Sequence, residues 1–164
     1  MLGALGDKIE LVTIAEQAGP VRSSVGPKTI ADYSFDNAPA LDFILIPGGI
    51  GTIAELKNDA LLNFLTERCP QSRVTMSVCT GSALLAKAWL LDGLAATTNK
   101  MFFELARSQG SNTQWQEAAR WVDAGQYVTS SGVSAWTDMA LAVIERLFGS
   151  ELAEMVMNLS LIHI

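Results

Sequence analysis

Two short apolar runs, each closed by a turn, constrain the fold of this chain most strongly. Residues 41–46 read L-D-F-I-L-I and end at Pro47-Gly48-Gly49, and the run Val74–Val78 ends directly at Cys79. Nearly continuous apolar strands of this kind are buried on both faces, as parallel sheets require. The two runs therefore predict buried parallel strands inside a layered α/β domain.

Helical patterns and further strands alternate with these two runs. Helices are predicted from Asn58 or Asp59 to Arg68 and over Thr80–Leu91, Met101–Ser108 and Ser134–Phe148. Strands are predicted over Ile9–Ala15 and Ala95–Thr98, with short edge strands within 21–35. A hairpin is predicted from Ala119–Val122 and Gln126–Ser130, joined at Asp123-Ala124-Gly125. Such alternation indicates a doubly wound, mostly parallel sheet with helices on both faces.

The two ends depart from this pattern. Residues 1–6 have the composition of the last turn of a helix whose body is missing, and the tail 159–164 is apolar without a stop signal. The alternative is a frayed start and a packed tail. We expect a truncated chain, with one domain over residues 1–158 that lacks its first strand and an atypical tail at 159–164.

Composition excludes several functional classes. The 164 residues carry a net charge of −6 without a basic cluster, which argues against nucleic-acid binding. No apolar run is long enough to span a membrane, and residues 1–6 do not form a signal peptide. Cys69 and Cys79 do not make a disulfide framework, so we expect a reduced, cytoplasmic protein. No metal-ligand spacing or phosphate-binding loop is present, and we expect no metal and no cofactor.

The segment Ser77-Val78-Cys79-Thr80-Gly81-Ser82 is the strongest chemical signal. A buried strand ends at Val78 and a helix begins near Thr80, which is the form of a nucleophile elbow. Helix N–H groups beside Cys79 would favour the thiolate and could stabilise negative charge on a substrate. Alternatively, Cys79 is a small buried apolar residue.

The turn Pro47-Gly48-Gly49-Ile50-Gly51 favours the first interpretation. It also follows a predicted parallel strand, so its N–H groups emerge at the same carboxyl edge of the sheet as Cys79. Sites of open α/β sheets lie at that edge. We therefore expect a reactive site around Cys79, Gly48, Gly49 and Thr80.

Four motifs resemble the DJ-1/PfpI family. They are I-P-G-G at 46–49, S-V-C-T-G-S at 77–82, A-T-T-N-K at 96–100 and S-S-G-V-S-A at 130–135. The branch that they resemble contains isonitrile hydratases and the amidotransferase-like domains of AraC-type regulators. The resemblance implies a flavodoxin-like three-layer sandwich, a homodimer, Cys79 at the elbow and an oxyanion site made by the N–H groups of Gly49 and Thr80.

The resemblance also places further residues around a pocket. These are Asn99, Ser131, Gly132 and Trp136. Trp136 stands where relatives often have a small residue, so it either narrows the pocket or packs in the core. Thr80 either binds substrate or caps the helix.

Two departures from the family pattern limit the chemistry. Asn99 and Lys100 stand where many members carry a histidine, and His163 in the tail is the only histidine. A Cys–His dyad is therefore not expected, which argues against a protease. The acidic residue that the family supplies after its first strand also has no counterpart here.

Three functions remain open. The first is an isonitrile hydratase-type lyase in which Cys79 attacks a small electrophilic molecule. The second is the ligand-sensing domain of an AraC-type regulator. The third is a redox or stress-response protein whose Cys79 is oxidised to a sulfinate.

Overall fold

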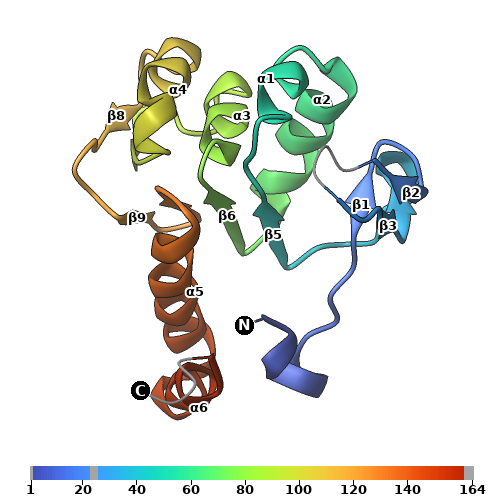
Figure 1. Cartoon of the computed structure of the whole chain (residues 1–164), viewed down its shortest axis with the longest axis vertical. Coiled ribbons are helices and arrows are strands. Elements are labelled where there is room, and N and C mark those ends of the chain that lie inside the picture. Colours follow the sequence, from blue (N-terminus) through green and yellow to red (C-terminus); the bar gives the residue numbers. More distant parts are fainter. Residues whose placement is uncertain (1, 23–25, 161–164) are drawn as a thin grey trace.

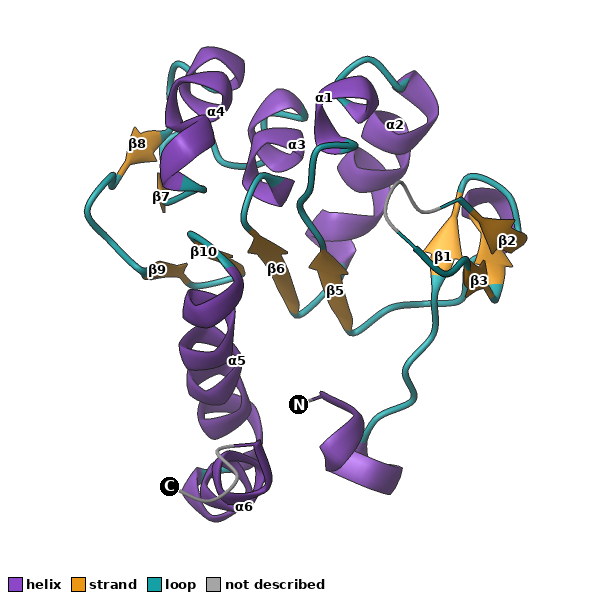
Figure 2. Ribbon diagram, viewed as in Figure 1, coloured by secondary structure: helices purple, strands orange, loops and turns teal. Residues whose placement is uncertain are grey.

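Four strands form the central sheet (Figures 1 and 2). Their order is β5 (Phe43–Ile46), β6 (Val74–Val78), β10 (Tyr127–Ser130) and β9 (Trp121–Ala124). The strands β5, β6 and β10 run parallel, and β9 pairs antiparallel with β10. The computed structural model describes residues 2–22 and 26–160, and the mostly parallel sheet expected from the sequence is confirmed there.

Helices cover both faces of this sheet, giving the three layers of a flavodoxin-like fold. The helices are α1 (Thr52–Glu55), α2 (Asp59–Arg68), α3 (Gly81–Lys87), α4 (Phe103–Gln109), α5 (Val133–Phe148) and α6 (Ser150–Ser160). One core joins Ile44 and Ile46 of β5 to Leu65 of α2 and Leu85 of α3. On the opposite face, Met76 and Val128 of the sheet pack against Met139 and Val143 of α5.

Short elements complete the described chain. They are the 3-10 helices Leu2–Lys8, Phe35–Asn37, Cys69–Gln71 and Lys100–Phe102, with the strands β1 (Ile14–Ala15), β2 (Gly19–Val21), β3 (Thr29–Ala31), β4 (Tyr33–Ser34), β7 (Ala95–Ala96) and β8 (Gln114–Trp115). The first 3-10 helix packs against α5 and α6 through Leu5, Ile144 and Val156. None of the described helices combines the length and apolar character that crossing a membrane would require.

Two predicted strands differ from the structure. Only Ile14–Ala15 of the predicted strand Ile9–Ala15 forms a ladder, a parallel pair with β4 outside the central sheet. Moreover, β5 is an edge strand and is not buried on both faces, because Leu45 is 37% exposed. The outer edge of β5 has no ladder partner among the described residues, and α5 covers the sheet mainly at β9 and β10.

The helix after the elbow is shorter than predicted. The expected helix Thr80–Leu91 is the seven-residue α3, Gly81–Lys87. Trp89 has a positive φ of 56°, which a regular helix does not allow, so the chain turns before Leu91. The predicted hairpin is confirmed, with its turn at Gly125 and Gln126 rather than at 123–125. The predicted tail begins within α6, and 161–164 lie outside the described residues.

Cys69 lies where α2 meets the following 3-10 helix and is fully buried. Burial raises the pKa of its thiol to about 11, from an ordinary value of 9.0. Burial, and then the charge of Cys69, raise the pKa of Tyr127 to about 12. Both groups therefore stay neutral in the folded protein at a pH where the unfolded chain would already lose those protons.

These shifts predict a loss of stability in alkaline solution. Because the unfolded state releases the Cys69 proton first, the free energy of unfolding should fall between pH 9 and pH 11, the two pKa values of the thiol. Each such group contributes a slope of up to about 1.4 kcal/mol per pH unit. Urea unfolding of wild type and Cys69→Ala across this range measures it. An equally steep decline in the variant would contradict the assignment.

Candidate active site

Cys79 occupies a strained turn between β6 and α3. Its φ of 57° lies in the left-handed region, which residues with a side chain seldom adopt. The Cys79 N–H donates to Ser130 O at 2.9 Å, which anchors the turn to the end of β10. The side chain is half-buried and the thiol is free. This is the nucleophile-elbow conformation that the sequence predicted.

Two glycines let the chain after β5 approach this turn closely. A Cβ added to Gly48 would lie 2.6 Å from both Thr80 N and Val78 O, and 2.8 Å from the Cys79 Cβ. A Cβ added to Gly81 would lie 2.5 Å from Ile46 O. Since backbone atoms make these contacts, a larger residue could not be accommodated by a change of rotamer. Glycine at position 81 therefore allows α3 to begin directly against the end of β5.

Gly49 and Thr80 are directly hydrogen-bonded to each other. The Gly49 N–H donates to Thr80 Oγ1 at 2.9 Å, and this hydroxyl donates to Gly49 O at 3.1 Å. Gly49 has a φ of 145°, which favours glycine at this position. Thr80 does not cap α3 with its side chain. The Gly49 N–H expected to bind an oxyanion is thus engaged by a neutral hydroxyl in this structure.

Hydroxyl groups also surround the backbone of Cys79. Thr98 Oγ1 donates to Cys79 O at 3.1 Å, and Ser82 Oγ donates to the same atom at 3.2 Å. Within the described residues, no carboxylate or imidazole is hydrogen-bonded to Cys79, and no cluster of His, Cys, Asp and Glu side chains could hold a metal ion. His163 lies outside the described residues.

Sequence reasoning missed two buried threonines of this site. Thr98 ends the segment after β7, and Thr52 begins α1, where its Oγ1 lies 3.0 Å from Thr80 Oγ1. The available signal for Thr98 was its place in the A-T-T-N-K motif at the carboxyl edge of the sheet. For Thr52 the only signal was its position directly after the glycine-rich turn.

The four residues expected around the pocket have different roles. The Asn99 side chain accepts from Met101 N at 2.9 Å and caps the next 3-10 helix. Ser131 and Gly132 lie between β10 and α5, where Ser131 N donates to Arg120 O and Gly132 O accepts from Trp136 N. Trp136 packs against the core under α5. Asn99, Ser131 and Gly132 therefore follow strands that end near Cys79, whereas the Trp136 contacts are those of a core residue.

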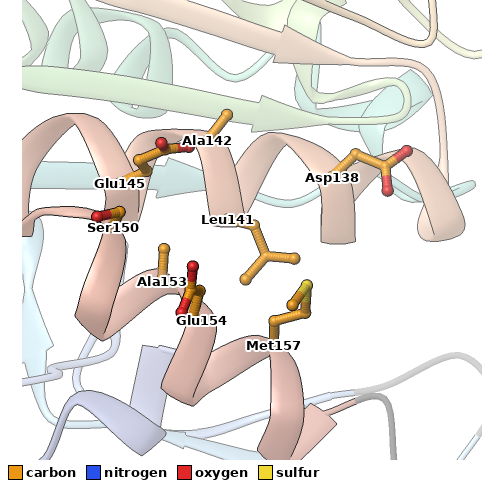
Figure 3. A pocket seen from close by; sticks show the side chains of 8 residues that line it. All are labelled: Asp138, Leu141, Ala142, Glu145, Ser150, Ala153, Glu154 and Met157. Carbon is orange, nitrogen blue, oxygen red and sulfur yellow. The ribbon is translucent and has the colours of Figure 1, made fainter.

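Two acidic residues form surface ion pairs. Asp138 lies beyond the first turn of α5 and pairs with Arg120 at 2.6 Å. Glu104 pairs with Arg107. A hollow of about 340 Å³ between α5 and α6 has Asp138, Leu141 and Met157 in its wall (Figure 3). It contains none of the residues of the elbow, so the two regions are separate.

Comparisons with known proteins identify the family of this chain. The DJ-1/PfpI family model matches residues 3–146. The chain belongs to the DJ-1/PfpI family. It is 31% identical over 156 residues to isonitrile hydratase from Pseudomonas putida, covering 95% of this chain and 67% of that protein.

Two other relatives mark the breadth of the family. The chain is 31% identical over 141 residues to the HTH-type transcriptional regulator GbdR of Pseudomonas aeruginosa, covering 86% of this chain and only 38% of that protein. Among solved structures, a THiJ/PfpI family protein from Pseudomonas syringae superposes with a TM-score of 0.84 at 26% identity. The superposition covers 99% of this chain and 66% of the Pseudomonas syringae chain.

The close approach at Gly48 predicts a local effect of substitution. Gly48→Ala should lower the free energy of unfolding by about 1–3 kcal/mol, because its Cβ would overlap the elbow backbone. Gly51→Ala is the matched control, since Gly51 has helical φ and ψ and open space around its Cα. Denaturant unfolding measures both variants, and iodoacetamide labelling of Cys79 reports on the elbow. Equal stability of the two variants would contradict the packing argument.

Proposed function

We propose that this chain contains the site of a cysteine-dependent hydratase that converts a small isocyanide into an N-substituted formamide. The observation that carries the proposal is the positive φ of Cys79, held between the β5 turn and α3. A strained elbow keeps a nucleophile exposed at the sheet edge, where a small molecule can reach it. The similarity to isonitrile hydratase over 95% of the chain supports this substrate class.

The reaction needs one nucleophile and one delivered proton. The Cys79 thiolate adds to the isocyanide carbon, and that carbon takes a proton, which gives a thioimidate bound to Cys79. Water then adds to the same carbon, while one of its protons moves to nitrogen. The carbon–sulfur bond breaks, the hydroxyl proton is released, and the formamide and the free thiolate result. One water is consumed for each isocyanide.

The residues around Cys79 suit addition better than peptide hydrolysis. Peptide hydrolysis requires a base to activate the nucleophile and an acid to protonate a leaving amine. Isocyanide hydration has no leaving group to protonate. The neutral hydroxyls of Thr80 and Thr98 lie beside the elbow, and no histidine contacts it among the described residues. We assign the Thr80 backbone N–H as the donor that faces the developing charge, while the Thr80 hydroxyl holds Gly49 beside the elbow.

Turnover of an aryl isocyanide tests the proposal. Purified protein should form the aryl formamide, followed by absorbance and confirmed by chromatography, while Cys79→Ser should lose more than about 100-fold in kcat. Cys69→Ala is the matched control, because Cys69 is buried away from the elbow and should retain activity. Equal formamide formation by wild type and Cys79→Ser would refute a reaction at Cys79, and no turnover by wild type would refute the hydratase.

A second function is supported by the similarity to GbdR over 86% of the chain. In this case the same elbow would bind a small ligand without reacting, as the sensing domain of a larger regulator. Calorimetric titration with small molecules separates the two proposals. A ligand that binds both wild type and Cys79→Ser with equal affinity, together with absence of isocyanide turnover, would favour sensing.

A further inference from the structure

Thr52 places a buried hydroxyl against the elbow, although it belongs neither to the turn at 47–51 nor to the elbow segment at 77–82. It is the first residue of α1 and only 6% exposed. Its Oγ1 lies 3.0 Å from Thr80 Oγ1, which is 28 residues away in the chain. Thr52 directly follows the N-cap residue of α1, which is Gly51 and has no side chain with which to cap the helix. In the described part of the chain, the hydroxyl of Thr52 is hydrogen-bonded to Thr80.

The hydrogen-bonding capacity of Thr80 determines the role of Thr52. A hydroxyl carries one proton and accepts two hydrogen bonds. Thr80 accepts from the Gly49 N–H at 2.9 Å and gives its own proton to Gly49 O at 3.1 Å. The second acceptor position of Thr80 is then filled when Thr52 donates. With this assignment each of the three groups is satisfied, as the burial of Thr52 and Thr80 requires of their hydroxyls.

We infer that Thr52 is a positioning residue of the proposed hydratase. It acts by keeping the Thr80 hydroxyl hydrogen-bonded to Gly49. Without the Thr52 proton, one acceptor position of a buried oxygen is left unpaired, and the Thr80 hydroxyl is free to rotate away from Gly49 O. Gly49 and Thr80, whose backbone N–H we assign to the developing charge, would then no longer be fixed relative to the Cys79 carbon adduct. Preorganised donors stabilise developing charge more than mobile ones do.

Thr52→Val tests this role with little change in side-chain shape. The variant should lose about tenfold in kcat and equally in kcat/KM for an aryl isocyanide, because it affects charge stabilisation rather than substrate binding. Thr52→Ser keeps the hydroxyl and should stay within about threefold of wild type. Thr113→Val is the matched control, since Thr113 is similarly buried at 7% and its hydroxyl has no partner within the described residues.

Amide exchange of Gly49, measured by NMR without substrate, keeps the inference testable if the proposed function fails. Exchange of the Gly49 N–H should be several-fold faster in Thr52→Val than in wild type, and near wild type in Thr52→Ser and Thr113→Val. If wild type does not hydrate isocyanides but Gly49 exchange follows this pattern, positioning by Thr52 stands and the hydratase is wrong. Unchanged Gly49 exchange in Thr52→Val overturns the positioning role, whatever the turnover.

Discussion

The contact between the β5 turn and the β6 elbow is the constraint on which the site depends. It is made by backbone atoms from both sides, with Gly48 against Thr80 N and Val78 O, and Gly81 against Ile46 O. Glycine is required on each side because any Cβ would lie closer than side-chain atoms tolerate. The parallel strands β5 and β6 are therefore followed by two turns whose backbones pack directly against each other. That packing holds Cys79 at its positive φ and brings the Thr80 hydroxyl onto Gly49.

Local sequence patterns were sufficient to place both turns at the same edge of the sheet, but not to predict the contact between them. Val74–Val78 and the turn at Gly48 and Gly49 could be located from apolar runs and glycine alone, because strand burial and close backbone approach each restrict residue type directly. Thr52 could not be found in this way. Its importance comes from a hydrogen bond across 28 residues, and in sequence it is only a threonine that starts a helix. The hydroxyl–hydroxyl contact depends on tertiary packing, which one chain segment does not reveal.

The errors in strand prediction have a related physical cause. Alternating residues show which face of a strand is apolar, but a strand also needs neighbours for its backbone N–H and C=O groups. Residues 9–13 have a strand-like pattern but form no ladder, and the outer edge of β5 is unpaired among the described residues. Leu45 of β5 is partly exposed because α5 covers the sheet mainly at β9 and β10. Sequence periodicity thus gave the orientation of these segments but not their pairing.

The composition of the hydrogen-bond network favours chemistry with a neutral electrophile. Thr52, Thr80, Thr98 and Ser82 supply uncharged hydroxyls, and each such bond is worth about 1 kcal/mol net. Bonds of this strength cannot replace a histidine that must accept a full proton from the nucleophile and return it to a leaving amine. They are adequate for orienting a backbone donor toward charge that forms briefly on an added carbon centre. Because several weak bonds act together only when each is held in place, the fixed geometry of Gly49 and Thr80 matters more here than the strength of any one donor.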